Sequence, residues 1–302
     1  MSKAIVFKNI TKSYGAVQAV KGINLSIEKG EFFGLLGPNG AGKSTLINML
    51  AGIVKPSSGT IIAMGHDVEK HYQESRHSLG IVPQELVFDP FFNVLEMMRF
   101  QAGYFGKGKE NYAWIDEILD KLDLTEKAYT NMRKLSGGMK RRALIAQALA
   151  HKPPVIVLDE PTAGVDVELR QRLWSFMKDL NNQGHTIVLT THYLEEAESL
   201  CKRIGMVNKG KLIALDDTKK LIKRNAVKNL NIKINQRDEL KIRKILSNFE
   251  ILIANECLTI TLEKIDELNS IIELLKENKI KFNDIQTTEP DLEKVFLELT
   301  KK

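Results

Sequence analysis

Short apolar runs and longer amphipathic stretches alternate along the first two thirds of the chain. Residues 31–36, 155–158 and 187–189 are almost continuously apolar, which is typical of strands buried on both faces of a parallel sheet. Stretches with helical spacing are 43–51, 93–104, 113–122 and 143–150. This alternation predicts an α/β domain built on a parallel sheet.

The last third of the chain has a different rhythm. Strand-like segments are 229–235, 251–254, 257–262 and 280–286, and helical segments are 238–249, 265–278 and 290–299. The order β-α-β-β-α-β-α predicts a small α+β domain of ferredoxin-like type. A length of 302 residues agrees with two domains, which we place at 1–217 and 229–302 with a basic linker at 218–228.

The strongest chemical signal is the loop after the first apolar run. The spacing Gly37-x-x-x-x-Gly42-Lys43-Ser44 is a P-loop, whose glycines let backbone N–H groups surround phosphates. Lys43 is expected to contact the β- and γ-phosphates, and the Ser44 hydroxyl is expected to hold Mg²⁺. The predicted nucleotide-binding loop comprises Gly37, Pro38, Asn39, Gly40, Ala41, Gly42, Lys43, Ser44 and Thr45.

Two acids follow the second apolar run. Asp159 and Glu160 emerge at the carboxyl end of a predicted buried strand, which is where open α/β sheets bind ligands. Asp159 is expected to support Mg²⁺, directly or through water. Glu160 is expected to act as the general base that activates the attacking water.

Residues 135–142, Leu-Ser-Gly-Gly-Met-Lys-Arg-Arg, precede a helical stretch. The side chain of Ser136 can cap that helix, while Gly137 and Gly138 let backbone N–H groups approach a phosphate. The segment resembles the signature motif of ABC-transporter ATPases. The fold that the resemblance implies is a P-loop NTPase ABC-ATPase core, with a helical subdomain at about 86–150.

Other motifs of that family occur in the expected order between residues 4 and 217. Tyr14 resembles the aromatic residue that stacks on adenine, and Gln84 resembles the glutamine that senses the γ-phosphate and the metal. Residues 163–166 resemble the D-loop, and His192 resembles the switch histidine that contacts the γ-phosphate. The resemblance implies ATP and Mg²⁺ as ligands and ATP hydrolysis as the reaction.

The resemblance also implies how the chain is assembled. Ser136, Gly137 and Gly138 would complete the ATP site of a second copy, so that ATP closes a head-to-tail homodimer and hydrolysis reopens it. The partner would be a separate integral membrane permease, whose coupling helix docks on the helical subdomain. The candidate groove residues are Phe88, Phe91, Phe92, Met97 and Met98, although core packing is the favoured explanation for any one of them.

Three features are similar to ATPases of ABC-2-type exporters: Met139 in the signature, residues 162–166, and the tail at 289–300. Gln147 stands where many relatives have arginine. Two alternatives remain. An importer ATPase would carry a regulatory domain of several short strands, and a soluble ABC protein acting on ribosomes or DNA would carry two ATPase cores or a long coiled coil.

Composition and charge indicate where in the cell the protein acts. No run approaches the roughly 20 apolar residues that span a bilayer, and the start of the chain lacks signal-peptide anatomy. We therefore expect a peripheral protein at the cytoplasmic face of the inner membrane. Residues 219–244 contain ten Lys or Arg and two acids. This segment is either a solvated surface or a contact with anionic lipid. Nucleic acid is a poorer candidate, because no aromatic residue lies among these charges.

Overall fold

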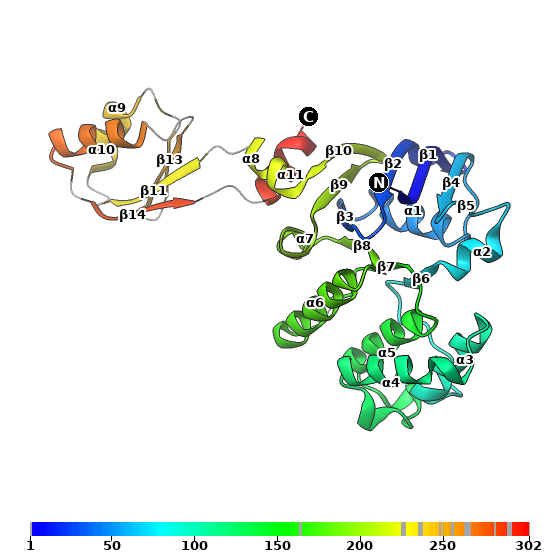
Figure 1. The fold of residues 1–302 in the computed structure, drawn as a ribbon. Coiled ribbons are helices and arrows are strands. Elements are labelled where there is room, and N and C mark those ends of the chain that lie inside the picture. The colour runs from blue at the N-terminus through cyan, green and yellow to red at the C-terminus, as the bar shows by residue number, and fades with distance from the viewer. Residues whose placement is uncertain are drawn as a thin grey trace. The chain divides into compact units, whose positions relative to one another are not determined.

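A computed structural model describes residues 2–162, 165–224, 228–234, 238–247, 249, 251–254, 257–262, 267–280, 282–288 and 292–301. The chain forms two compact units, Met1–Thr218 and Lys219–Lys302. Figure 1 shows the first unit as a sheet-containing part above a group of helices. Among the described residues, no helix has both the length and the apolar character that crossing a membrane requires.

A six-stranded sheet forms the centre of the first unit. Its order is β10-β9-β3-β8-β7-β6, in which the last five strands run parallel and β10 is antiparallel to β9. The strands are β3 (Phe32–Leu36), β6 (Leu79–Val82), β7 (Val155–Asp159), β8 (Thr186–Thr191), β9 (Arg203–Asn208) and β10 (Lys211–Asp217). Strands β3, β7 and β8 are buried at every position, as the continuous apolar runs predicted.

A four-stranded antiparallel sheet, of order β2-β1-β4-β5, was not predicted from the sequence. Its strands are β1 (Lys3–Tyr14), β2 (Val17–Glu28), β4 (Ser58–Ala63) and β5 (His66–Asp67). One face contributes Ile5, Ile10 and Ile23 to a core that it shares with the central sheet. The pairing of β1 with β2 contains several register shifts, which interrupt the alternation that normally reveals a strand.

The helices of the first unit are α1 (Lys43–Leu50), α2 (Tyr72–His77), α3 (Val94–Tyr104), α4 (Tyr112–Lys121), α5 (Gly137–Leu149), α6 (Val167–Asn182) and α7 (Leu194–Leu200), with short 3₁₀ turns at Lys109–Asn111, Thr125–Lys127 and Met132–Lys134. Four of them, α1, α3, α4 and α5, correspond to predicted stretches and agree with them to within two residues at most ends, whereas α2, α6 and α7 were not predicted. Asn93 and Glu96 form a capping box that starts α3. Helix α5 begins six residues earlier than the predicted stretch, because Ser136 caps it.

The second unit contains β11 (Lys228–Ile234), α9 (Glu239–Ile245), β12 (Ile251–Ala254), β13 (Cys257–Leu262), α10 (Glu267–Glu277), β14 (Phe282–Thr288) and α11 (Leu292–Lys301). The element order is the predicted one. The four strands form an antiparallel sheet of order β12-β13-β11-β14, and α9 and α10 supply Ile242 and Ile271 to its core.

The segment predicted as a linker contains regular structure. Helix α8 (Thr218–Arg224) begins directly after β10, and its Leu221 is buried. Residues 218–224 of the predicted basic linker are therefore helical. The sequence did not reveal this helix, because Leu221 stands among Lys219, Lys220 and Lys223 and the segment is too short to show an apolar period.

Candidate active site

Four neighbouring strands deliver the predicted site residues to one edge of the central sheet. Strand β3 ends at the P-loop, β6 ends two residues before Gln84, β7 ends at Asp159, and β8 ends directly before His192. Because β3, β8, β7 and β6 are adjacent and parallel, their carboxyl ends lie side by side. The sheet thus gathers segments that are about 150 residues apart in the sequence.

The P-loop needs its glycines for reasons of space. A Cβ atom on Gly37 would lie 2.2 Å from the carbonyl oxygen of Val207, and one on Gly42 would lie 2.7 Å from that of Ala19. Gly42 also has a φ of 109°, which a side chain would strain. Helix α1 begins at the next residue, so that its N-terminal N–H groups and dipole face the cleft.

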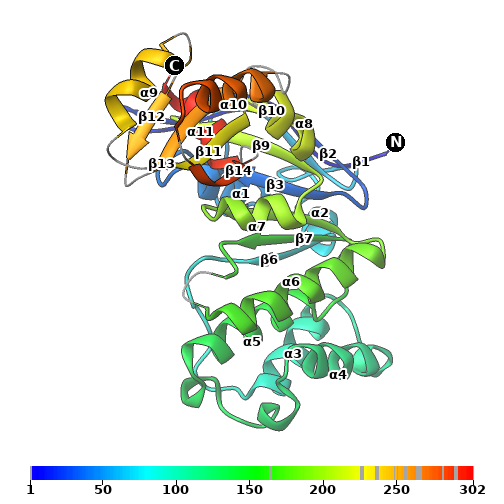
Figure 2. The ribbon, with the colours of Figure 1, turned by 90° about the vertical axis from the view of Figure 1, so that its left-hand side faces the viewer.

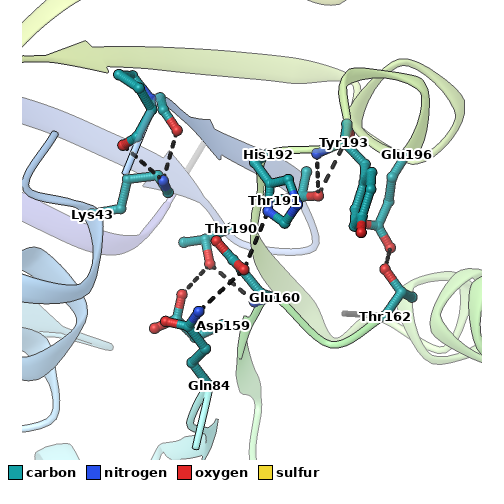
Figure 3. Close-up of polar contacts among 12 residues, drawn as sticks. Lys43, Gln84, Asp159, Glu160, Thr162, Thr190, Thr191, His192, Tyr193 and Glu196 are labelled. Atoms are coloured by element: carbon teal, nitrogen blue, oxygen red, sulfur yellow. Dashed lines mark hydrogen bonds and ion pairs between the residues drawn. The ribbon is translucent and has the colours of Figure 1, made fainter. Parts of the chain in front are cut away.

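Lys43 lies at the start of α1 and is buried. Its Nζ donates to the carbonyl oxygens of Gly37 at 2.6 Å and Pro38 at 3.2 Å, which Figure 3 shows above the carboxylates. Burial lowers the pKa of this ammonium group, while Glu160 and Asp159 oppose that effect. The cation is therefore held inside the loop by carbonyls.

A polar cleft lies over the P-loop. The residues that line it are Tyr14, Ala19, Asn39, Gly40, Ala41, Gly42, Lys43, Ser44, Thr45, Gln84 and Glu160. Tyr14 is half exposed at the end of β1, with the Lys12 ammonium 5.0 Å from its ring centre. Tyr14 therefore lies at the cleft together with the P-loop residues.

Glu160 contacts several of the polar residues drawn in Figure 3. Its backbone is in the left-handed region, with a φ of 49°, and its N–H donates to the carbonyl oxygen of Thr190 at 3.0 Å. Its side chain is buried, and its Oε2 lies 3.2 Å from both Gln84 Nε2 and His192 Nδ1. The predicted base, sensor and switch residues therefore meet at one carboxylate oxygen.

Asp159 occupies a deeper position than Glu160. It is buried, and its Oδ1 accepts a hydrogen bond from the Thr190 hydroxyl. The Ser44 hydroxyl is exposed and lies on the cleft with Gln84. Carboxylate, hydroxyl and amide oxygens are the donors that Mg²⁺ takes in proteins, so these residues fit a magnesium ion chemically.

The signature residues do not belong to this cleft. Ser136 caps α5 by accepting the Met139 N–H at 3.3 Å, as predicted. Figures 1 and 2 both place α5 in the lower helical part, well away from α1. Within the described residues, Ser136 and Gly137 are exposed and neither lines the nucleotide cleft. Gly138 is half-buried against Leu169.

The D-loop is described only in part. Ala163 and Gly164 lie outside the described residues. Val165 is buried, and Asp166 starts α6 by accepting the Leu169 N–H at 2.8 Å. The predicted D-loop therefore connects Glu160 to the N-terminus of α6.

Arg141 is a site residue that the sequence alone did not reveal. It is buried on α5, and its guanidinium donates to the carbonyl oxygens of Pro83 at 2.8 Å and Gln84 at 2.7 Å. Burial lowers its pKa, against the opposing effect of Asp159 and Glu160. Lys140, Arg141 and Arg142 look alike in sequence, and no local signal distinguishes the one that holds the Gln84 backbone.

Comparisons with known proteins agree with this arrangement. A family model described as ABC transporter matches residues 20–163. A linearmycin resistance ATP-binding protein of Bacillus subtilis (strain 168) is 38% identical over 97% of this chain and 97% of its own length. A Nod factor export ATP-binding protein I of Cupriavidus metallidurans is 39% identical over 71% of each chain.

Solved structures show the same fold for the first unit. An ATP-binding subunit of an ABC transporter matches with a TM-score of 0.70 and 25% identity, covering 73% of this chain and 92% of that one. A dimeric ATP-binding cassette in a post-hydrolysis state, bound to ADP and Pi, matches with a TM-score of 0.66 and 29% identity, covering 70% and 98%. The chain therefore belongs to the ABC transporter family, as an ATP-binding member that hydrolyses ATP.

Proposed function

We propose that this chain is the ATP-binding and ATP-hydrolysing subunit of an ABC-2-type membrane exporter. It acts as a homodimer at the cytoplasmic face of the inner membrane, beneath a separate integral membrane permease. One observation supports this most: the cleft gathers Lys43, Gln84 and Glu160, whereas Ser136 is exposed on another part of the unit. A second copy that presents its Ser136 would complete each site.

We propose the following residue roles. The loop N–H groups and Lys43 bind the phosphates, and Tyr14 stacks on adenine. Glu160 takes the proton of the attacking water as the water oxygen bonds to the γ-phosphorus and the bond to the β–γ bridging oxygen breaks. Ser44, Asp159 and Gln84 hold Mg²⁺, which neutralises phosphate charge when it is bound.

Two neighbours engage the Glu160 carboxylate. Gln84 Nε2 and His192 Nδ1 both contact its Oε2, at 3.2 Å each. A γ-phosphate competes for both donors, because it carries more charge than a carboxylate. Binding of ATP would therefore free Glu160 and move His192 towards the phosphate.

An exposed apolar surface on the helical subdomain supports the proposal that this chain binds a membrane permease. Phe91, Phe100 and Tyr104 are exposed on α3 and the loop before it, and Val87 is exposed after Gln84. Such a surface suits an apolar helix of a partner. Met97 and Met98 are buried on α3, so core packing, the alternative weighed against a groove position, holds for these two residues.

Export, rather than import, is supported by the relatives. One is a Nod factor export protein and one a linearmycin resistance protein, and the latter matches over 97% of this chain. We propose that the second unit is an accessory domain of the ABC-2 type, of which residues 289–291 lie outside the described part. The basic residues of α8 can contact anionic lipid.

The hydrolysis role is tested with Glu160→Gln. Glutamine keeps the shape and the hydrogen bonds but cannot take a proton. We expect turnover to fall by roughly 10²–10⁴-fold with ATP binding retained, and an ATP-stabilised dimer to accumulate in size-exclusion chromatography. Normal hydrolysis by this variant would remove Glu160 from the role of base.

The transport role is tested by purifying the full-length chain from membranes with mild detergent. A permease should co-purify as a multi-spanning membrane protein, and a Phe91→Ser/Phe100→Ser variant should lose it. The matched control is Ile53→Ser, which removes an equally exposed apolar side chain near α1. If both variants retain the same membrane protein, the proposed docking surface is wrong, and if no membrane protein is found, the exporter proposal fails.

A further inference from the structure

Glu196 is a buried carboxylate that none of the roles above explains. It lies in the first turn of α7, four residues after His192, and is fully buried. Burying a carboxylate is costly unless other groups compensate it. Within the described residues, no lysine, arginine or histidine forms an ion pair with it. Its place in the interior therefore needs a reason.

The hydrogen bonds of Glu196 give a reason for its buried position. Oε1 accepts from the Thr162 hydroxyl at 3.0 Å and from the Trp174 indole N–H at 2.9 Å. Figure 3 shows the bond to Thr162 beside Tyr193. Thr162 follows Glu160 by two residues, and Trp174 lies on α6. One oxygen thus joins three segments: the loop after β7, helix α6 and helix α7.

The other oxygen of Glu196 differs from Oε1, and a second contact joins α6 to the segment before α7. Oε2 is buried and has no hydrogen-bond partner in the part of the chain that the structure describes. Helix α6 reaches the switch segment a second time, because the Arg170 guanidinium lies 5.0 Å from the Tyr193 ring centre. The Tyr193 ring in turn lies 4.1 Å from the His192 ring. The switch segment is therefore fixed to α6 on both sides.

We infer that Glu196 is a positioning residue for ATP hydrolysis. By holding Thr162 and Trp174, it sets the separation between the loop that carries Glu160 and the segment that carries His192. This inference rests on the proposed roles of those two residues. Hydrogen bonds to a carboxylate are about twice as strong as those between neutral groups. This strength would keep the loop after β7, α6 and α7 connected while His192 moves. Misplacing a reacting group by about 1 Å can cost roughly 10²-fold in rate.

The test uses steady-state hydrolysis of ATP with Mg²⁺ by the full-length chain. In Glu196→Ala we expect kcat to fall by roughly 10–100-fold, with KM changed less than about threefold because the P-loop is untouched. Glu196→Gln keeps an oxygen that can accept both hydrogen bonds, so it should recover most of the lost kcat. The loss in a Thr162→Val/Glu196→Ala double variant should be smaller than the product of the two single losses.

Two controls separate positioning from general stability. Leu200→Ala removes a buried apolar side chain from the same helix, and Glu195→Ala removes an exposed carboxylate beside Glu196. Tryptophan fluorescence gives the unfolding midpoint of every variant. A positioning role requires that Leu200→Ala loses comparable stability and keeps its kcat.

The inference is overturned if Glu196→Ala keeps the wild-type kcat, if the glutamine variant is as slow as the alanine variant, or if kcat follows stability alone across the controls. Glu160→Gln, measured in parallel, reports on the proposed base separately. Normal turnover by Glu160→Gln would refute the base assignment, whereas the Glu196 comparison is decided by its own kcat values.

Discussion

At the scale of single residues, His151 shows how burial sets a charge state. It follows α5, is buried, and stacks on Phe105 with ring centres 3.9 Å apart. Burial lowers its pKa to about 4. The folded protein therefore keeps the ring neutral at pH values where the unfolded chain, with a pKa of about 6.5, takes up a proton.

The sign of the pH effect follows from this difference. Stability is highest above the unfolded pKa, falls as pH drops from about 6.5 to about 4, and changes no further from this group below that. In the wild type, this group should lower the free energy of unfolding by about 2 kcal/mol between pH 7 and pH 5. In His151→Phe, which keeps a ring stacked on Phe105, we expect this decrease to be absent. Both tryptophans, Trp114 and Trp174, lie in the first unit, so their fluorescence reports its unfolding. An unchanged pH dependence, equal to that of the exposed-site control His71→Phe, would contradict the role of His151.

At the scale of elements, α5 carries the signature at its start and two adjacent arginines that contact different segments. Arg141 donates to the carbonyl oxygens of Pro83 and Gln84. Arg142 donates to that of Leu122 and forms an ion pair with Asp123 at 3.0 Å. Of these two arginines, it is Arg141 that connects α5 to the Gln84 backbone.

This difference gives a matched pair of variants. Arg141→Met should lower kcat by roughly tenfold, since Gln84 loses its anchor next to Glu160. Arg142→Met should lower stability by about 1–3 kcal/mol, because it leaves a buried carbonyl unpaired, and should keep kcat. Arg141→Lys should fall between wild type and Arg141→Met, since an ammonium lacks the fork that reaches both carbonyls. Equal kcat values in the two methionine variants would show that Arg141 is only structural.

At the scale of the whole molecule, the first unit carries all the predicted nucleotide-site residues yet leaves its signature unused by its own cleft. Gly137 is exposed, and a Cβ atom there would meet nothing within 4 Å. A side chain at this position is therefore tolerated by the isolated chain. Any effect of Gly137→Asp on ATP binding has to arise in an assembly.

The split site is tested by mixing chains that carry Lys43→Ala with chains that carry Gly137→Asp. The first lacks a phosphate cation, and the second places negative charge where the γ-phosphate of the partner's site lies. In a mixed dimer one site collects both lesions and the other has none. With Glu160→Gln in both chains to prevent turnover, mixing should restore about one trapped ATP per dimer, as expected from a two-site assembly. If either variant alone trapped ATP as well as its parent, the head-to-tail dimer would be wrong.

Several features were predictable from the sequence because they depend on neighbouring residues. The P-loop spacing needs only the glycines, Lys43 and Ser44 in order. The Ser136 cap is a contact with the N–H three residues later, and the alternation of β11 to β14 is visible strand by strand. The family resemblance was confirmed by a family model that matches residues 20–163, which include the P-loop and the signature.

What the tertiary structure decided is which of these segments meet. Strand order in a parallel sheet follows from packing between distant segments, so that β8 next to β7 brings His192 to Glu160 although 31 residues lie between them. The same is true of Arg141 at Gln84 and of Glu196 at Thr162. Burial had no local signature either, because apolar periodicity alone does not distinguish the core residue Met98 from the exposed Phe91. Local patterns therefore determined the parts of the ATP site, and long-range packing determined their contacts.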